Sequence, residues 1–374
     1  MIVDVFSKWV WLVGGGDRVT ASVVEALLEE GHEVILHTTQ PVNLHVLGEM
    51  FDKEVDKVTL KIHDRCQDVL RPIRLGRMYV NLVSEFLEHS PMKGDLFVDL
   101  SPASCLGATY LRLPDIAYWN PPGDFHEIIA HARDGHIYRR IAFVPYLAIL
   151  LRLMDRMNSI PVNFVNSRYT ETVIRDFYLG RLHTELELLY PPVDIESWIE
   201  PESFERKGVI SVARFAPWKR HDLQLKIVGS DISLTMVGGA RDVQEINTVH
   251  SLEKLRGPNV RVLINQPISQ LRHLLWSSKV FIHTADNEPF GLSIVEAIAA
   301  GCIPIIRNCG GAVEIVPFRD LTFDTVEEAR EKVRRALSGD CDRYLPKLRE
   351  HIKQFDETIF RQRFLEKIVR RKDD

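Results

Sequence analysis

The sequence alternates short apolar runs with helix-length segments from end to end, and this alternation constrains the fold more than any other feature. Short apolar runs bounded by turn residues predict buried strands, and helical segments between them predict parallel strands joined by crossover helices. The runs expected to form strands are residues 9–13, 33–38, 57–62, 95–100, 115–119, 162–165, 208–215, 234–239, 260–264, 279–284 and 303–306. The sequence therefore predicts an α/β protein with doubly wound parallel sheets.

The alternation is interrupted once, near the middle of the chain. Tyr190 to Asp194 reads Y-P-P-V-D, which two prolines keep extended, and a polar, charged segment follows from Ile195 to Lys207. A chain of 374 residues with 45% hydrophobic and 26% charged residues is long enough for two domains. We expect an amino-terminal domain over residues 1–193, a carboxyl-terminal domain over residues 194–355, and a charged amphipathic helix in the last segment, 356–374.

The overall composition excludes several classes of protein. A net charge of −5 argues against a general nucleic-acid binder. The 5 cysteines show no C-x-x-C pair and no metal-like spacing, which predicts reduced thiols in the cytoplasm. No stretch approaches the roughly 20 apolar residues of a membrane-spanning helix. The amino terminus runs directly into a helix and is interpreted as a first strand, not as a signal peptide.

The stretch from Asn287 to Ile305, N-E-P-F-G-L-S-I-V-E-A-I-A-A-G-C-I-P-I, places Glu288 and Glu296 around a turn that opens a helix ending at Gly301. A strand precedes the turn, and open α/β sheets bind ligands at the carboxyl ends of their strands. The helix start offers unpaired N–H groups and a positive dipole end to an anion. Glu296 is expected about two helical turns beyond Glu288, pointing back to the same ligand. A capped surface helix with two solvated glutamates would show the same spacing.

A second candidate site is the triple glycine at residues 14–16, between the first strand and a helix from Asp17 to Glu30. Glycines at such a turn let a phosphate or a sugar approach the backbone closely. A dinucleotide site would require a third glycine where Val19 stands and an acidic residue at the end of the second strand, which reads H-T-T instead. A site for a phosphorylated or sugar ligand and a purely structural turn remain as the alternatives.

Two cations, Arg214 and Lys219, are expected at the carboxyl end of the first strand of the second half. Next to helix N–H groups they could stabilise the charge that develops on a diphosphate leaving group. No D-x-D string that would chelate a metal-bound diphosphate is present, and we expect no metal and no other cofactor. The alternative is that Arg214 and Lys219 are two ordinary basic residues with no ligand.

Three further segments permit more than one interpretation. The loop W-N-P-P-G-D-F-H carries Asn120, Asp124 and His126 after the fifth strand, where one of them could contact a sugar or act in catalysis. Arg71, Arg74 and Arg77 form a basic turn that is either solvated or binds an anion or lipid headgroup. The apolar segment 139–157 is either a buried packing helix or a helix lying on an anionic membrane, and contact with such a membrane would make the protein peripheral on its cytoplasmic face.

Taken together, V-A-R-F-A-P-W-K-R-H-D, N-E-P-F-G-L-S-I-V-E-A-I-A-A-G-C-I-P-I and G-G-A-V-E-I-V resemble the motifs of family 4 retaining glycosyltransferases of GT-B fold. G-G-G-D-R-V, V-N-S-R-Y-T-E and Y-P-P-V-D in the first half agree, so the resemblance covers nearly the whole chain. The chain looks most like the α-1,2-mannosyltransferases that extend dolichol-linked oligosaccharide from GDP-mannose. The resemblance implies two Rossmann-like doubly wound domains facing a central cleft, with the final helix crossing back onto the first domain.

The resemblance also implies roles for individual residues. Arg214 and Lys219 would hold the diphosphate of a nucleotide sugar, Glu296 would bind the ribose, and Glu288 would lie nearest the transferred sugar. Further donor contacts would come from Gly15, Gly16, Gly239, Ile268, Pro289, Phe290, Gly291, Leu292 and Ser293.

A family histidine is replaced in this chain by Asn120, which can hydrogen-bond a sugar but cannot transfer a proton near neutral pH. Either His126 substitutes for it or the histidine is not needed.

The resemblance implies that the protein transfers a hexose to a glycan or lipid-linked acceptor without a metal ion. The implied hexose is mannose and the implied donor is GDP-mannose. The transfer would retain the anomeric configuration by same-face attack. The alternatives are a nucleotide-sugar-binding regulatory or partner subunit, favoured by Asn120, and an epimerase or phosphorylase of the same fold.

Overall fold

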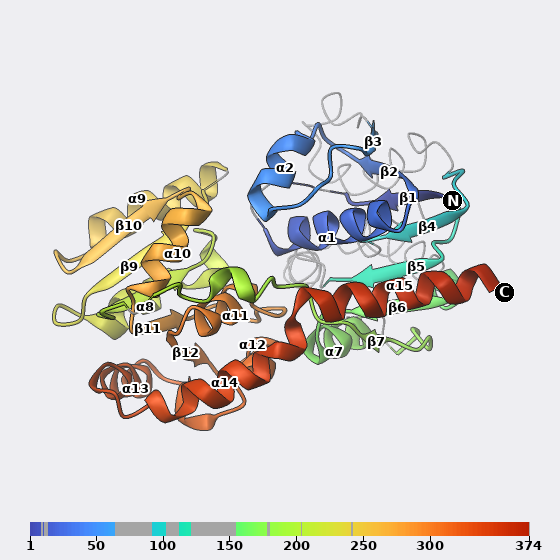
Figure 1. The fold of residues 1–374 in the computed structure, drawn as a ribbon. Coiled ribbons are helices and arrows are strands. Elements are labelled where there is room, and N and C mark those ends of the chain that lie inside the picture. The colour runs from blue at the N-terminus through green and yellow to red at the C-terminus, as the bar shows by residue number, and fades with distance from the viewer. Residues whose placement is uncertain are drawn as a thin grey trace, which may run out of the picture. The chain divides into compact units, whose positions relative to one another are not determined.

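The computed structural model describes residues 1–8, 10, 14–63, 92–101, 112–120, 155–177, 180–202, 204–240 and 242–373 (Figure 1). These residues form two compact units. One contains Met1–Tyr190 together with Arg361–Asp374, and the other contains Pro191–Phe360. The division at 190/191 lies three residues before the expected boundary at 193/194.

The first unit is built on a parallel sheet with the strand order β3-β2-β1-β4-β5-β6-β7. Its strands are β1 (Ile2–Phe6), β2 (Glu33–Thr38), β3 (Thr59–Ile62), β4 (Leu96–Asp99), β5 (Ile116–Trp119), β6 (Val162–Val165) and β7 (Glu187–Leu188). The described helices are α1 (Gly15–Glu29), α2 (Leu44–Phe51) and α7 (Arg168–Phe177). Buried apolar side chains dominate β4 and β5 in the middle of this sheet, as a parallel sheet covered on both faces requires, whereas the edge strand β3 is largely exposed.

The first strand differs from its prediction. β1 is Ile2–Phe6, whereas the run 9–13 was expected to form it; Val10 lies outside any strand, and residues 9 and 11–13 lie outside the described part of the chain. The apolar pattern of β1 is interrupted by Asp4, which is buried. Its carboxylate accepts hydrogen bonds from His37 Nε2 at 2.8 Å and from the Gly94 N–H at 2.7 Å. The apolar pattern did not predict this strand because Asp4, a polar residue with buried hydrogen-bond partners, interrupts it.

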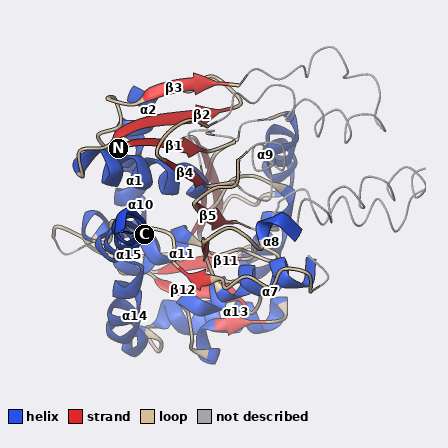
Figure 2. Cartoon of the chain, turned by 90° about the vertical axis from the view of Figure 1, so that its right-hand side faces the viewer, coloured by secondary structure: helices blue, strands red, loops and turns tan. Residues whose placement is uncertain are grey.

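The second unit repeats the architecture with the strand order β10-β9-β8-β11-β12-β13. Its strands are β8 (Val209–Val212), β9 (Leu234–Gly238), β10 (Val260–Ile264), β11 (Val280–His283), β12 (Ile303–Arg307) and β13 (Thr322–Phe323). Its helices are α8 (His221–Val228), α9 (Val243–Leu255), α10 (Ile268–Trp276), α11 (Leu292–Ala299), α12 (Ala312–Ile315), α13 (Val326–Ser338) and α14 (Leu345–Ile352). Figure 2 shows these helices in blue and the strands in red. All pairings in both sheets are parallel, as the alternation predicted.

The final helix, α15 (Glu357–Asp373), contains the division between the two units. In the first unit, Arg361 pairs with Glu25 of α1 at 3.0 Å, and Arg363 pairs with Glu187 of β7 at 3.0 Å. Both carboxylates lie on elements far from α15 in the sequence. These ion pairs attach α15 to helix α1 and to strand β7 of the first unit.

Several predicted features lie outside the described residues, namely Arg71, Arg74, Arg77, His126 and most of the segment 139–157. Across the described ranges, no helix is both long enough and apolar enough to cross a membrane.

Candidate active site

The carboxyl ends of β8 and β11 lie where the strand order of the second sheet reverses. Residues 213–220 follow β8, and residues 284–291 follow β11. Open α/β sheets bind ligands outside the carboxyl ends of their strands at such a switch point. Lys219 from the first loop and Glu288 from the second form an ion pair through Nζ and Oε2. The sheet thus joins two predicted site residues that lie 69 positions apart in the sequence.

The Lys219–Glu288 pair is nearly buried, with side chains 12% and 10% exposed. Burial opposes the charged form of Glu288, but the Lys219 cation and a hydrogen bond from His283 outweigh burial and hold the pKa of Glu288 well below its ordinary value. Burial also lowers the pKa of Lys219, and the Glu288 carboxylate partly offsets that shift. Glu288 is therefore an acceptor at neutral pH, and the ammonium of Lys219 has further N–H groups for an anion.

Arg214 lies on the same loop and is held by a second carboxylate. Its Nη1 donates to Glu245 Oε1 of α9 at 2.9 Å, and its side chain is 28% exposed. The ring centroid of Trp218 lies 4.2 Å from Lys219 Nζ and 5.7 Å from Arg214 Cζ. The Trp218 ring thus lies close to both cations. Two cations beside a switch point can bind a diphosphate.

Polar contacts fix the two loops to each other. The Asp286 carboxylate accepts from Arg220 Nη1 at 3.0 Å and also pairs with Arg307. The Asp286 N–H donates to the Trp218 carbonyl at 3.0 Å. Arg220 adopts φ 54°, a left-handed conformation that is unfavourable for a side chain of this type and that its ion pair helps to hold.

Two glycines allow the backbones around the site to approach closely. A Cβ at Gly238 would lie 1.9 Å from the Ala213 carbonyl oxygen, just before Arg214. A Cβ at Gly310 would lie 2.5 Å from the Glu288 carbonyl oxygen, and Gly310 has φ +70°. The Gly311 N–H donates to the same carbonyl at 2.7 Å. The glycine pair after β12 therefore sets the position of the Glu288 backbone.

Helix α11 begins immediately after the Glu288 turn. It starts at Leu292, and Gly291 precedes it with φ 109°. Glu288 therefore lies outside the helix, and the expectation that Glu296 follows it by two helical turns is wrong; Glu296 is the fifth residue of α11. Counted over whole residues, Glu288 and Glu296 are 8% and 6% exposed, so neither is a solvated surface glutamate.

The residues between Glu288 and α11, with the first turn of α11, are further predicted donor contacts. The ring of Phe290 packs edge-on against Phe355 with centroids 5.1 Å apart, and Phe290 is 2% exposed. Pro289 and Gly291 flank it, and Leu292 and Ser293 form the first turn of α11, where backbone N–H groups have no partner within the helix.

Two other predicted donor contacts lie at neighbouring strand ends. Gly239 follows β9, and its carbonyl accepts from the Phe215 N–H at 3.0 Å, which attaches it to the Arg214 loop. Ile268 begins α10 after β10, at the edge of the sheet.

The remaining described candidates belong to the first unit. Gly15 and Gly16 are exposed in the first turn of α1, and a Cβ at Gly16 would have no atom within 4 Å. Asp17 Oδ2 accepts from the Gly14 N–H at 2.8 Å and caps the helix start. Asn120 follows β5, and its side-chain oxygen accepts from Asn166 Nδ2 at 2.8 Å.

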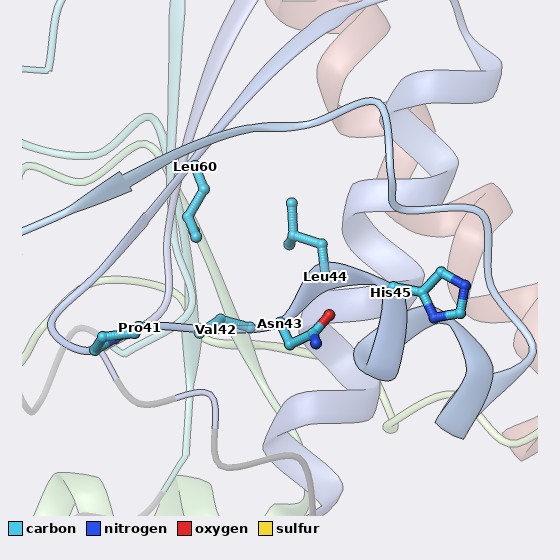
Figure 3. Close-up of a pocket in the computed structure, with 6 residues that line it drawn as sticks. All are labelled: Pro41, Val42, Asn43, Leu44, His45 and Leu60. Atoms are coloured by element: carbon cyan, nitrogen blue, oxygen red, sulfur yellow. The ribbon is translucent and has the colours of Figure 1, made fainter.

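A shallow hollow elsewhere in the first unit contains none of the predicted site residues. It lies between the start of α2 and β3 and is lined by Pro41, Val42, Asn43, Leu44, His45 and Leu60 (Figure 3). Asn43 caps α2 through a bond from the Val46 N–H at 3.3 Å.

Sequence reasoning missed several side chains that hold the site. His283 hydrogen-bonds Glu288 Oε2 at 3.1 Å, Glu245 holds Arg214, and Asp286 joins Arg220 to Arg307. Only His283 gave a usable signal, because a histidine at the end of an otherwise apolar strand is unusual. Glu245 and Asp286 lie among other acidic residues and are indistinguishable from surface charges in the sequence.

Comparison with known proteins agrees with this arrangement. The family described as Glycosyl transferases group 1 matches residues 194–356, the segment that carries the Lys219–Glu288 pair. A Dictyostelium discoideum protein named GDP-Man:Man(3)GlcNAc(2)-PP-Dol alpha-1,2-mannosyltransferase is 31% identical over 235 residues, which are 54% of this chain and 46% of that protein. The human protein of the same name is 28% identical over 237 residues, 55% of this chain and 48% of that protein. The chain thus matches about half the length of these relatives.

Solved structures agree in fold. The sucrose-phosphate synthase of Thermosynechococcus elongatus superposes with a TM-score of 0.71 at 14% identity, covering 99% of this chain and 98% of that one. Its fold is the GT-B arrangement of two parallel-sheet, Rossmann-like domains, which confirms the predicted fold class. Residues 194–356 of this chain therefore match the group 1 glycosyltransferase model, and the chain has the GT-B fold.

Proposed function

We propose that the chain is a glycosyltransferase that transfers a hexose from a nucleotide-diphosphate sugar to a glycan or lipid-linked acceptor. We propose that the hexose is mannose and that the donor is GDP-mannose. The observation that carries the proposal is the ion pair of Lys219 and Glu288, beside Arg214, at the switch point of the glycosyltransferase domain. The names of the Dictyostelium and human relatives support GDP-mannose as the donor and a lipid-linked oligosaccharide as the acceptor.

The proposed chemistry assigns separate tasks to the two cations and the carboxylates. Arg214, Lys219 and the backbone at the start of α11 bind the diphosphate and stabilise the negative charge that develops when the bond to the sugar breaks. Glu296 binds the ribose of the donor. Glu288, which is held ionised, accepts a hydrogen bond from the sugar and lies beside the positive charge that forms at the reacting carbon.

We propose further that the transfer retains the anomeric configuration by same-face attack and requires no metal ion. The two cations could supply the positive charge that a metal ion would otherwise supply. Asn120 cannot transfer a proton, which is consistent with a mechanism in which the leaving phosphate itself accepts the proton of the acceptor. Determination of the product anomer by NMR tests retention, and turnover after treatment with a chelator tests metal independence. An inverted product, or full loss of turnover restored by added metal, would overturn the respective claim.

The first experiment is a panel of GDP-, UDP- and ADP-sugars with a lipid-linked mannosyl acceptor. We expect transfer from GDP-mannose and a fall in kcat/KM of about 100-fold in Lys219→Ala, because one fixed group that stabilises the leaving charge is removed. Lys226→Ala is the matched control, since Lys226 is a 66% exposed lysine on α8. Full activity of Lys219→Ala would exclude its proposed role.

A regulatory or partner subunit without transferase activity is the second candidate, and Asn120 is the observation that favours it. Binding of GDP-mannose without hydrolysis or transfer across the acceptor panel would support this function instead.

We also propose peripheral contact of this protein with an anionic membrane on the cytoplasmic side. Flotation with vesicles that contain anionic lipid, compared with neutral vesicles, tests it.

A further inference from the structure

We propose that His283 is a positioning residue that anchors Glu288 by one carboxylate oxygen, Oε2, and leaves Oε1 to the transferred sugar. The inference rests on the proposed function in that it assigns the free oxygen to the donor. It concerns a residue that neither the sequence motifs nor the comparisons single out.

The contacts of the Glu288 carboxylate are one-sided. Lys219 Nζ and His283 Nε2 both hydrogen-bond Oε2, the latter at 3.1 Å. Among the described residues, none donates a hydrogen bond to Oε1. Because an ionised carboxylate only accepts hydrogen bonds, His283 must donate from Nε2, which defines the protonated nitrogen of its ring.

Two donors on one oxygen restrict the carboxylate more than the ion pair alone does. A lysine is a flexible point charge and can follow the carboxylate, whereas the imidazole is fixed at the end of β11 and is 3% exposed. The bond from the ring therefore determines the direction in which Oε1 points. A bond of this kind is useful to a site only where the geometry of the second oxygen matters.

The other nitrogen of the ring gives independent support. Nδ1 of His283 is buried and has no hydrogen-bond partner among the described residues. An unpaired buried polar atom destabilises a fold, and a phenylalanine at this position would avoid the penalty. Packing therefore does not explain the imidazole. Its contribution to this part of the chain is the bond to Glu288.

The experiment compares three substitutions of one side chain. His283→Gln keeps a donor, since the amide nitrogen of Gln can occupy the place of Nε2. His283→Asn is too short to reach Glu288, and His283→Phe keeps a ring without a donor. We expect kcat to fall by about 10- to 100-fold in the Asn and Phe variants, with the donor KM changed less than threefold, and to stay within about threefold of wild type in the Gln variant.

A second measurement separates this inference from the proposed function. The carboxyl carbon of Glu288, assigned by comparison with Glu288→Gln, is titrated by NMR in the absence of substrate. We expect its midpoint to rise in His283→Phe and to remain close to wild type in His283→Gln. Failure of the wild-type protein to transfer any sugar would overturn the proposed function, and the titration would still decide the role of His283.

Two outcomes would overturn the inference. One is a wild-type kcat in the His283→Asn and His283→Phe variants. The other is that His283→Gln and His283→Phe show the same midpoint of the Glu288 titration and the same kcat. That result would mean that the histidine itself, and not its hydrogen-bond donor, determines both quantities. Thermal unfolding of each variant establishes that all three are folded under the conditions of the assay.

Discussion

The hydroxyl of Thr284 donates to the backbone carbonyl of Lys219 at 3.0 Å. The same hydroxyl accepts from Gln224 Nε2 at 3.0 Å, and both side chains are buried. Thr284 follows β11 directly, so this bond attaches the loop that carries Lys219 to the strand that leads to Glu288. The position of the cation therefore depends on a buried network as well as on the ion pair itself.

Replacing Thr284 by Val tests this dependence. Valine keeps the shape but removes the partner of the Lys219 carbonyl and one of the two acceptors of Gln224 Nε2, which still donates to Ser211 Oγ at 2.8 Å. We therefore expect a loss of about 1–3 kcal/mol in the free energy of unfolding, measured with urea. We also expect a lower kcat. Thr284→Ser retains the hydroxyl and is the matched control. A Val variant as stable and as active as the Ser variant would show that the network does not position Lys219.

Removing the Lys219 cation from its ion pair with Glu288 should change how the free energy of unfolding depends on pH. The folded-state pKa of Glu288 is lowered, so its contribution to stability is fully present above its unfolded pKa and is lost as the pH falls through the folded pKa. Lys219→Ala leaves a buried carboxylate without its cation and should cost about 3 kcal/mol at pH 7. Both proteins have the same unfolded pKa at Glu288, so the difference between their free energies of unfolding should narrow as the pH falls through the raised folded-state pKa of Glu288 in the variant.

Urea unfolding at a series of pH values measures this difference. The control is the same substitution in a Glu288→Gln background, where the dependence on pH that comes from this pair should be absent. A difference between wild type and Lys219→Ala that stays constant from pH 7 down to about pH 3 would contradict the assignment of the ion pair.

The sequence predicted most of the architecture because parallel strands covered on both faces must be apolar along their length. The run 33–38 therefore coincides with β2, and the run 303–306 contains all of β12 except its last residue, Arg307. The pattern failed where chemistry interrupts it: Asp4 interrupts β1, and β7 and β13 have two residues each and leave no apolar run. Short strands and strands with a buried charge depend on distant partners, which local patterns do not record.

For the site, the sequence predicted the pairing partners but not the groups that hold them. Lys219 and Glu288 were both expected at strand ends, and the strand order brings those ends together. The direct bond between the two was not predicted, because each was assigned to a different part of the donor. The supporting contacts of His283, Glu245 and Asp286 join loops that are distant in the sequence, so only the folded sheet reveals them.

The two buried glutamates should differ in their effect on kinetics. We expect Glu288→Gln to lower kcat by about 100-fold with a small change in the donor KM, because the interaction acts on charge in the transition state. We expect Glu296→Gln to raise the donor KM about tenfold with a smaller change in kcat, because a ribose contact is made in both states. Steady-state kinetics with GDP-mannose distinguishes them. The same pattern of defects in both variants would reject the separate roles.

The buried carboxylate of Asp4 should make the first unit sensitive to acid. Burial alone would raise its pKa, but the hydrogen bonds from His37 and the Gly94 N–H lower the pKa below its ordinary value. Its contribution to stability is therefore present above an unfolded pKa of about 3.9 and is lost as the pH falls further. We expect Asp4→Asn to lose about 1–3 kcal/mol at pH 7, since an amide cannot accept both bonds equally, and to approach wild type at lower pH.

Urea unfolding at pH 7 and near pH 3 measures the effect. Asp52→Asn is the control, because Asp52 is exposed at the end of α2 with φ 56°, a conformation that Asn tolerates. Equal losses at both pH values would indicate that packing, and not the charge of Asp4, is responsible.

The exposed glycine at the start of α1 offers a test of donor binding that is free of structural side effects. A Cβ at Gly16 would meet no atom within 4 Å, and the residue lies in the first turn of a helix, so Gly16→Ala should leave stability unchanged or raise it by about 0.4–1 kcal/mol. If a phosphate or sugar of the donor approaches this backbone, the added methyl group should still raise the donor KM or lower kcat by about tenfold or more. Glu30→Ala, an exposed change at the other end of α1, is the matched control. Thermal unfolding and kinetics with GDP-mannose together decide the outcome: a Gly16→Ala protein with normal stability and normal kinetics would remove the triple glycine from the donor site and leave it as a structural turn.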